Sequence, residues 1–561
     1  MNKQITTFVL SLMIGGELVA QATTLPELPR TQVDVTLPTV NGTTLFATCA
    51  TMQAQINAAA ALDPNLTHQI ILATGTTCVG PYKLPAHTNG TGWILIKGTN
   101  YASLPPPGTR VSLSDAASMP QVKYGEAGVY WGTFTAMTGA QRYRIIGIDM
   151  VQDSSITPNE AFVVMGYNSQ KALNTGYLIF DRCVLRDTDA AHSSIRGVWG
   201  DAQLGHTALI DSYVSGFKDS SRDTQAWTSI NNPGPILIQN NFLEAAGENV
   251  MFGGAPPASD SVMPRDVTIK RNIMSKNPAW WGAANPVTKC LLELKLGQRV
   301  LIEGNDFLNM PWNEGGNAFR LTVRNENGSA PFADVSDVTI CYNLASNVVN
   351  FIGSFGSDDQ GPTRLSKHSK RWYIHDNLVY GLGWLCGGGA SCGAFYSMQN
   401  GGHGCTDPTP TCKNEDITIA HNTVDDVHAY MFFASLPGQV GLDFRDNLIN
   451  VNGGRGAFSP SFWGQNFLNS AFGSTWSWTN NRLAGIGGGE NTSAYPQGAN
   501  SYPASHTNFL WKDHAARDYT LQAGSPAKNA ASDGTDQGVN FSAYNAARSG
   551  YSAGGKPNNK P

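Results

Sequence analysis

Two charged residues interrupt a leucine-rich segment, C-L-L-E-L-K-L, between residues 290 and 296. Neighbouring side chains of a β-strand point to opposite faces, so leucines in a core would place Glu293 and Lys295 together on the outer face. The segment A-F-R-L-T-V-R, residues 318–324, has the same alternation and would place Arg320 and Arg324 outward. Stacked strands would gather these four side chains into one charged patch.

β-Elimination in a uronic-acid polysaccharide is one reaction that this patch could support. The reaction needs neutralisation of the substrate carboxylate, a base for the adjacent C–H, and a proton for the leaving oxygen. Arg320 or Arg324 can neutralise the carboxylate, because a guanidinium binds it through two hydrogen bonds and stays charged. Lys295 can act as the base only if its pKa falls from about 10.4, which the arginines favour and Glu293 opposes.

A metal ion on Glu293 would remove that opposition. Oxygen atoms of Glu293 and of Asn249, one coil earlier, could bind Ca²⁺, which usually takes six or more ligands. Asp223 extends the patch by a further coil, and Trp312 lies near an insertion, where its ring suits stacking on sugars. The predicted site therefore has catalytic residues Lys295 and Arg320, substrate-binding residues Arg324, Asp223 and Trp312, and metal ligands Asn249 and Glu293.

The strands that carry the patch belong to a repeat. Segments such as P-I-L-I-Q-N-N-F-L and D-V-T-I-K-R-N-I-M share an apolar-x-x-N pattern about 30 residues apart. The last position of the pattern falls at Cys183, Tyr213, Asn241, Asn272, Asn305, Asn343, Asn377, Asn422, Asn447 and Asn481. Asparagine tolerates the left-handed backbone conformation, and its amide can bond to identical residues above and below, so this position predicts a stacked turn.

Alternation with a period of two, without helical phase or a propeller signature, predicts one turn of a parallel β-helix per repeat. We expect an all-β protein, a single-stranded right-handed parallel β-helix of about eleven or more coils. Residues 52–65 have helical character and would cap the first coil. We divide the chain into a signal peptide (1–22), an N-terminal cap with first coils (23–140), β-helix repeats with groove-forming loops (141–485), and a C-terminal closing segment and tail (486–561).

Composition and the first residues indicate an exported protein. Of 561 residues only 14% are charged, with 60 glycines, and the net charge of −5 argues against nucleic acid as a partner. Residues 1–22 show Lys3, an apolar run and Ala20-Gln21-Ala22, as in a signal peptide. No later stretch is apolar enough to span a membrane. We expect a secreted, periplasmic or cell-surface protein, with disulfides at Cys49/Cys78, Cys386/Cys392 and Cys405/Cys412.

The chain resembles the pectate-lyase-like β-helix superfamily of exported polysaccharide-active proteins over most of residues 45–540. The resemblance rests on the helix followed by I-I-L-A-T-G-T-T-C-V-G-P-Y-K-L-P, on the I-x-x-N repeats, and on Y-T-L-Q-A-G-S-P-A-K-N near the end. The patch is similar to that of alginate and chondroitin lyases of polysaccharide lyase family 6. This likeness implies Ca²⁺ on Asn249 and Glu293, Lys295 as base and Arg320 as acid. This chain departs from the family's pattern, because only one glutamate, Glu293, precedes Lys295, and the spacing between the two residues is shorter than in that family.

Two other functions stay open. Asp358-Asp359 and Gly402-His403-Gly404 are similar to motifs of polygalacturonases, which hydrolyse their substrate with paired carboxylates. A noncatalytic β-helix that binds carbohydrate or adheres to a surface is the second alternative. Glu244 and Glu248, in L-E-A-A-G-E-N, are as well explained by a turn between coils as by catalysis.

Overall fold

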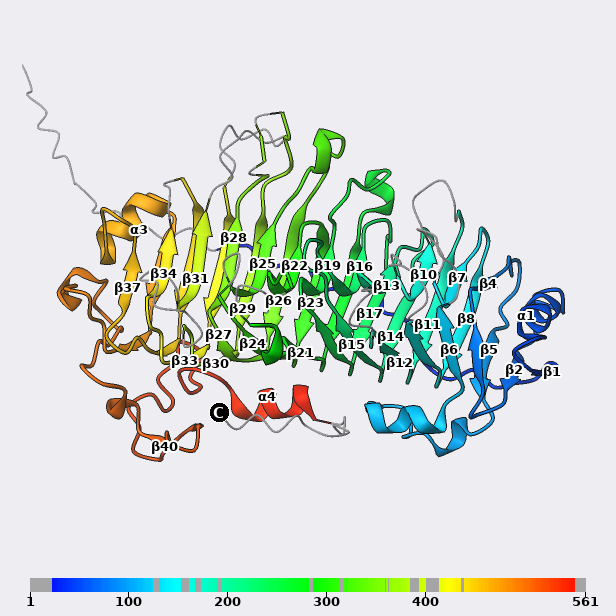
Figure 1. Ribbon diagram of the computed structural model, residues 1–561. Coiled ribbons are helices and arrows are strands. Elements are labelled where there is room, and N and C mark those ends of the chain that lie inside the picture. Colours follow the sequence, from blue (N-terminus) through cyan, green and yellow to red (C-terminus); the bar gives the residue numbers. More distant parts are fainter. Residues whose placement is uncertain are drawn as a thin grey trace, which may run out of the picture.

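Alternating apolar side chains from three strands per coil fill one continuous interior, which gives the parallel β-helix of Figure 1. The computed structural model describes residues 23–549 except 125–131, 153–160, 167–172, 189–193, 282–285, 313–315, 359, 362, 384–392, 400–412 and 435–437. The predicted signal peptide and the cysteine pairs Cys386/Cys392 and Cys405/Cys412 lie outside the described residues. Cys49 and Cys78 form the predicted disulfide.

Three parallel sheets build the coils, and each coil contributes one strand to each sheet in turn. Sheet 1 has 14 strands in the described chain. They are β1 (Thr44–Ala47), β2 (His68–Leu72), β5 (Ile94–Gly98), β8 (Gln141–Ile146), β11 (Gly176–Asp181), β14 (Thr207–Ile210), β17 (Ile236–Gln239), β20 (Arg265–Lys270), β23 (Gly297–Glu303), β26 (Val335–Cys341), β29 (Lys370–His375), β32 (Glu415–Ala420), β35 (Val440–Arg445) and β38 (Trp476–Thr479).

Sheet 2 follows sheet 1 in each coil and has 13 strands among the described residues. They are β3 (Thr77–Val79), β6 (Gln121–Tyr124), β9 (Asp149–Gln152), β12 (Val184–Arg186), β15 (Tyr213–Phe217), β18 (Phe242–Ala245), β21 (Ile273–Ser275), β24 (Asp306–Met310), β27 (Leu344–Val348), β30 (Leu378–Tyr380), β33 (Thr423–Asp425), β36 (Leu448–Asn450) and β39 (Arg482–Ala484).

Sheet 3 completes each coil, with 12 strands in the part of the chain that is described. They are β4 (Tyr82–Leu84), β7 (Phe134–Ala136), β10 (Val163–Gly166), β13 (Arg196–Gly200), β16 (Gln225–Ser229), β19 (Glu248–Phe252), β22 (Cys290–Leu294), β25 (Asn317–Thr322), β28 (Asn350–Phe355), β31 (Ala394–Gln399), β34 (Tyr430–Ala434) and β37 (Arg455–Phe458). The predicted all-β parallel β-helix of eleven or more coils is confirmed.

Few helices accompany the sheets. The α-helices are α1 (Met52–Ala60), α3 (Gly464–Phe472) and α4 (Phe541–Arg548), and β40 (Trp511–Asp513) pairs with β41 (Asp518–Leu521) in an antiparallel hairpin. Short 3-10 helices are η1 (Tyr101–Ser103), η2 (Leu113–Ser118), η3 (Asp260–Val262), η4 (Pro278–Trp280), η5 (Glu326–Gly328), η6 (Thr492–Ala494) and η7 (His506–Phe509). Among the described residues, no helix is long and apolar enough to cross a membrane.

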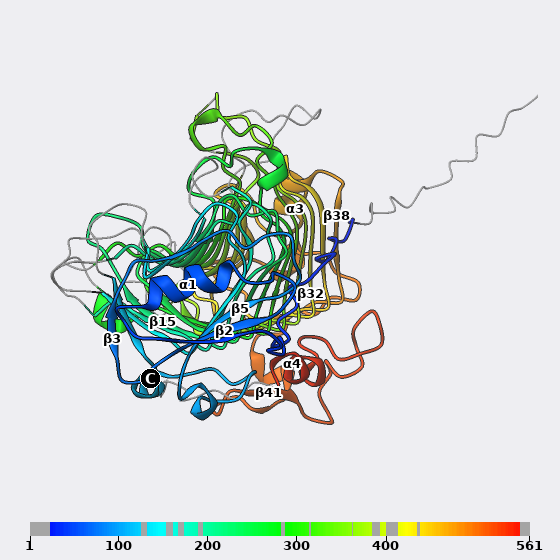
Figure 2. The ribbon, with the colours of Figure 1, turned by 90° about the vertical axis from the view of Figure 1, so that its right-hand side faces the viewer.

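Helix α1 lies across the N-terminal end of the coils, as Figure 2 shows. Its buried residues Met52, Ile56 and Ala59 join the interior core. The helix therefore extends the apolar interior at the N-terminal end of the stack of coils. Its role as a cap stays a prediction.

Stacking of like residues continues along the interior. Ile269, Ile302, Ile340, Ile374 and Ile419 are successive partners in sheet 1, and all five are fully buried. Each coil therefore presents to the next a surface of the same shape, which favours close packing.

The asparagine ladder forms at the turn between sheets 1 and 2. Both the backbone N–H and the side-chain amide of Asn305 donate to Oδ1 of Asn343, at 2.9 and 3.0 Å. The same side-chain amide donates to the carbonyl of Ile269 at 2.9 Å. This pattern repeats from Asn241 to Asn481. The ladder thus satisfies buried backbone groups that the turn would otherwise leave unpaired.

Two details of the predicted ladder were wrong. Ser212, not Tyr213, occupies the ladder position, because its hydroxyl accepts the backbone N–H of Cys183 and its own N–H donates to Asn241. The left-handed conformation belongs to the residue before each ladder asparagine, such as Asn240, with φ of 55°, and Asp376, with φ of 52°. The turn therefore needs one residue that tolerates positive φ and a different one that bonds along the stack.

Replacing Asn305 by alanine is expected to lower the free energy of unfolding by about 2 to 4 kcal/mol, because a buried N–H and a buried carbonyl lose their partners. The exposed Asn65, replaced by alanine, serves as the matched control. Thermal and denaturant unfolding would measure both. Equal small losses in the two variants would show that the ladder contributes little.

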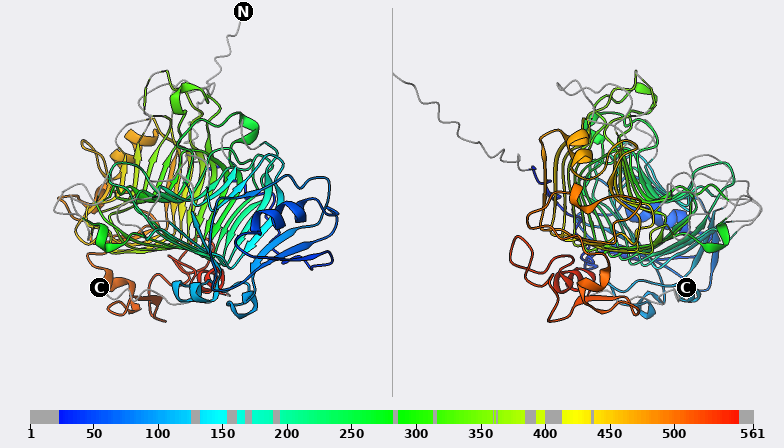
Figure 3. Two further views of the ribbon diagram at one scale, coloured as in Figure 1. Left: turned by 45° about the vertical axis from the view of Figure 1, so that its right-hand side comes forward. Right: turned by 90° about the vertical axis from the view of Figure 1, so that its left-hand side faces the viewer.

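Segments outside the coils cover the outer faces of two sheets. Residues 23–43 run along sheet 1, where the backbone N–H groups of Glu27 and Arg30 donate to Asp337 and Asp266. The C-terminal segment packs on sheet 2 around Leu378 and Leu448, and Figure 3 shows it, orange to red, against one side of the coils. Residues 99–120 cover an earlier part of sheet 2. The charged patch predicted from the sequence lies on sheet 3.

Candidate functional site

Neighbouring strands of sheet 3 bring the charges of the patch together. Glu293 on β22 is the register partner of Arg320 on β25, and Lys295 follows directly after β22. The Glu293 carboxylate lies 3.7 Å from Nζ of Lys295 and 3.9 Å from Nε of Arg320. Their interior neighbours Leu292, Leu294, Phe319 and Leu321 are buried in the core, which fixes the outward direction of the charges.

Arg324 lies beside this group, and its backbone N–H donates to the carbonyl of Lys295. Its guanidinium is 3.6 Å from Asp358, which is fully buried and accepts backbone N–H groups of Asn325 and Gln360. Those bonds give Asp358 a structural role in its loop. Of the other groups named for a hydrolase, Asp359 and His403 lie outside the described residues.

Two of the predicted substrate-binding residues are more peripheral. Asp223 pairs with Lys289, whose Nζ lies 2.6 Å away, and Lys289 in turn lies 4.0 Å from Glu248. Asp223 therefore extends the charged group toward earlier coils, as expected from the sequence. The side chain of Trp312 is half exposed, next to residues 313–315, which are not described.

Asn249, predicted as a metal ligand, does not face Glu293. Its amide is fully buried, donates to the carbonyls of Leu243 and Ser275, and accepts from Nζ of Lys276. Asn249 and its neighbour Val250 are both fully buried, so the alternation is interrupted between them, and Glu248 rather than Asn249 faces Glu293. Strict alternation would have placed Asn249 outward with Met251, the register partner of Glu293, and the sequence did not show this interruption.

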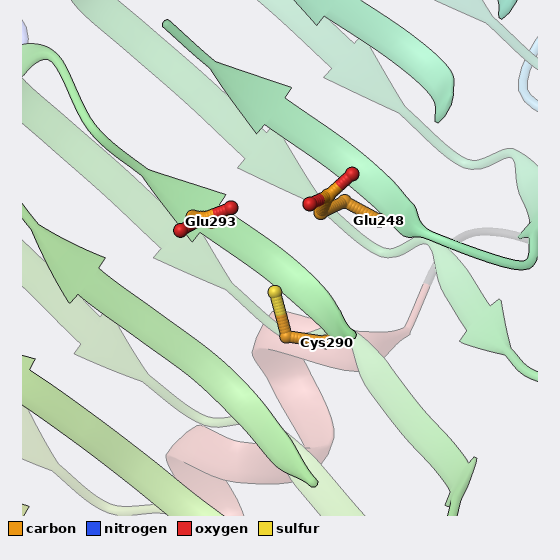
Figure 4. A group of neighbouring side chains, drawn as sticks. All are labelled: Glu248, Cys290 and Glu293. Carbon is orange, nitrogen blue, oxygen red and sulfur yellow. The ribbon is translucent and has the colours of Figure 1, made fainter. Parts of the chain in front are cut away.

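Glu248, Cys290 and Glu293 form a compact group on β19 and β22 (Figure 4). One possible ligand atom from each lies within 4.8 Å of the others, and all three residues are buried. Glu248, which a turn explained equally well in the sequence, is the first residue of a strand. The structure pairs it with Cys290, three residues before Glu293, and this register is not visible in the sequence.

The electrostatics of Glu248 follow from this crowding. Burial, and then the negative charges of Glu293 and Asp223, raise the pKa of Glu248 to about 7. Gln225 donates to Oε2 at 2.7 Å, whereas Oε1 has no hydrogen-bond partner in the described structure. A buried carboxylate oxygen without a donor can bind either a proton or a cation.

Lys295 has a pKa above its ordinary value. Burial by itself disfavours the ammonium, but the carboxylates of Glu293 and Glu248 outweigh burial and raise the pKa of Lys295. Lys295 is therefore an ammonium while those carboxylates carry their charges. It can accept a proton only when that negative charge is offset.

Glu248 and Glu293 fit a small cation better than Cys290 does. Carboxylate oxygens are preferred by Ca²⁺, and Oε1 of Glu248, which accepts no hydrogen bond in the described structure, adds an available acceptor. Burial and the nearby carboxylates raise the pKa of the Cys290 thiol well above its usual range, so it stays a neutral thiol and a poor ligand for Ca²⁺. The group is a possible acidic metal site built on two carboxylates.

Lys276 supports the group from the interior. Its buried Nζ donates to the carbonyls of Ala245 and Gly247 and to Oδ1 of Asn249, at 2.7 to 2.8 Å. Burial lowers the pKa of Lys276 to about 7. These bonds fix the turn that precedes Glu248 and thereby position its carboxylate. Nothing in the sequence near Lys276 indicated this role.

The known proteins that are similar to this chain are distant from it in sequence. No protein-family model matches the chain, and no curated protein matches it. Among solved structures it is similar to a mannuronic acid specific polysaccharide family 6 lyase from human gut microbiota, with 10% identity, a TM-score of 0.46 and coverage of 79% of this chain and 86% of that one.

Two further structures are similar in the same way. The family 6 alginate lyase AlyGC shares 11% identity, with a TM-score of 0.44 over 88% of this chain and 58% of that one. Pectate lyase Pel9A shares 12%, with a TM-score of 0.34 over 89% and 96%. At such identities the likeness concerns the fold alone. The three parallel sheets define the class of this protein as the parallel β-helix, and the fold that the resemblance implied is confirmed.

Proposed function

We propose that the protein is an exported polysaccharide lyase that cleaves an acidic, uronic-acid polysaccharide by β-elimination on the outer face of sheet 3. The observation that carries the proposal is the pair of cations on adjacent coils, Lys295 and Arg320, both within 4 Å of the Glu293 carboxylate. Their side chains keep 12% and 24% of their surface exposed, so a polymer on this face can reach them.

Each residue has a distinct task in this reaction. Arg324 neutralises the substrate carboxylate, which makes the adjacent C–H more acidic. Lys295 takes that proton, the C–O bond on the next carbon breaks as the double bond forms, and Arg320 supplies the proton to the leaving oxygen. Asp223 and Trp312 contact the polymer farther along the face.

Lys295 can serve as the base only when the negative charges of Glu248 and Glu293 are neutralised. A bound Ca²⁺ would supply positive charge at these two carboxylates. Lys295 would then lose the interaction that raises its pKa, and the arginines nearby would favour its neutral form. With the carboxylates uncompensated, Lys295 stays an ammonium that can only hold the anionic substrate.

A panel of polysaccharides tests this function. The protein would be incubated with alginate, pectate and glycosaminoglycans, with and without Ca²⁺, and followed by the ultraviolet absorbance of unsaturated uronates, by reducing ends and by retention on the same polymers. We expect new absorbance together with reducing ends on one acidic polymer. Reducing ends alone would identify a hydrolase, and retention without either product would identify a noncatalytic binding protein.

A further inference from the structure

A polar cavity lies over sheet 2, away from the charged patch on sheet 3. Its volume is about 340 Å³, within the range of small-molecule sites. Its walls come from Arg110 in the segment 99–120, from Arg271 and Asp306 in the coils, and from Asn545 and Arg548 of α4. Figure 1 shows α4, red, and the segment 99–120, blue to cyan, side by side beneath the coils. The cavity therefore joins two segments that are separated by more than four hundred residues.

The cavity has an excess of positive charge. Three arginines line it, and the lining contains one carboxylate, Asp306, which is already paired with Arg548. The other polar lining residues are the neutral Asn240, Asn272, Asn545 and Ser549. Guanidinium groups that share a small, partly desolvated space repel one another, so an anion between them would be bound favourably.

Arg110 is the least satisfied of the three arginines. Only 6% of it is exposed, its Nε is buried without a hydrogen-bond partner, and its Nη2 lies 3.5 Å from Oδ1 of Asn240. Burial lowers the pKa of Arg110 to about 10, while Asp306 and Asp211 favour its charged form, so it stays charged at neutral pH. A buried cation with so few acceptors provides donors for an incoming oxyanion.

The other two arginines link the cavity to α4. Nε of Arg271 donates to the carbonyl of Ala547 at 2.6 Å, and Nη1 of Arg548 donates to the carbonyl of Asn305 at 3.2 Å. These bonds fix both guanidinium groups at the cavity wall. An anion held among the three arginines would therefore also tie α4 to the segment 99–120.

We propose that this cavity binds a compact oxyanion, a sulfate, a phosphate or the carboxylate of a sugar acid, among Arg110, Arg271 and Arg548. The site is separate from the lyase site and does not depend on the proposed function. It links the two segments that cover sheet 2, so its occupancy stabilises the fold.

Thermal unfolding of the full chain tests the proposal. Sodium sulfate and sodium phosphate would be titrated against sodium chloride at matched ionic strength. For the wild type we expect a saturable rise of the unfolding midpoint by several degrees beyond chloride. Arg110→Gln is expected to need at least about tenfold more anion for the same rise. Arg30→Gln, an exposed arginine on the sheet 1 side, should behave as the wild type and controls for the general effect of sulfate.

Asn545→Asp gives an independent result if Arg110→Gln does not fold. A carboxylate on α4 at the cavity wall should raise the midpoint in the absence of oxyanion and remove the saturable rise. A rise that persists unchanged in either folded variant would overturn the proposal. A uronic-acid monosaccharide or a short oligouronate in place of sulfate separates the sources: stronger binding of the sugar identifies a carboxylate on a saccharide, and equal or weaker binding identifies a free oxyanion.

Discussion

Replacing Lys295 or Arg320 by alanine is expected to reduce turnover of an acidic polysaccharide by at least about 100-fold, because each would remove a proton-transfer group. Both variants should still fold cooperatively, and the loss of stability should stay within about 3 kcal/mol, since each removes one cation near the buried Glu293 carboxylate and leaves the other. The rate of unsaturated uronate formation measures the first effect, and the unfolding midpoint measures the second.

Matched controls keep this result specific. Lys512→Ala and Arg30→Ala remove the same side chains from exposed ion pairs with Asp518 and Glu27, outside sheet 3. Both should retain full turnover. The double variant of Lys295 and Arg320 should be scarcely slower than either single variant, because groups that act in one step are not additive. Unfolding of both single variants would instead assign Lys295 and Arg320 to the structure, and full turnover in either would remove it from the mechanism.

Replacing Glu248 by glutamine is expected to stabilise the metal-free protein at alkaline pH and leave it unchanged at acidic pH. The pKa of Glu248 rises from 4.5 in the unfolded chain to about 7 in the folded protein. The folded state therefore holds the extra proton between these values, so the stability from Glu248 is present below about pH 4.5 and is lost as the pH rises through 7. The full difference is about 3 kcal/mol.

Unfolding midpoints of wild type and Glu248→Gln, measured in chelator from about pH 4 to about pH 9, would show this divergence. Glutamine preserves the shape of the side chain and an acceptor for Gln225, which donates to Glu248. Glu303→Gln on sheet 1 controls for loss of a carboxylate elsewhere. Parallel curves for wild type and Glu248→Gln would show that Glu248 does not hold a proton at neutral pH.

Added Ca²⁺ extends the same experiment to the proposed cation site. At alkaline pH, Ca²⁺ should raise the midpoint of the wild type toward that of Glu248→Gln, because positive charge would relieve the repulsion between Glu248 and Glu293. The variant should respond little. An equal response of both proteins would place the calcium effect elsewhere, and no response in the wild type would leave the carboxylate pair as a proton-binding site only.

Periodic features of the chain were readable from the sequence. The asparagine positions from Asn241 to Asn481 predicted the stacked turn, because each coil repeats the same hydrogen bonds with the next. Alternation in the strands likewise predicted that Glu293 and Arg320 face outward on one sheet. These predictions succeeded because they depend on local alternation and on nearest-neighbour stacking.

Only the tertiary structure decided the features that are not periodic. An interruption of the alternation between Asn249 and Val250 determined that Glu248 faces Glu293 and that Asn249 bonds to Lys276 from the next coil. The sequence also could not predict that Arg110 and Arg548 line one cavity. The segments outside the coils follow no repeat, and their positions depend on packing against sheet 2. The sequence alone thus determined the coil and the outward direction of its charges. Which of those charges lie close together was decided by the turns and the covering segments, because the path of these segments depends on contacts between residues far apart in the chain.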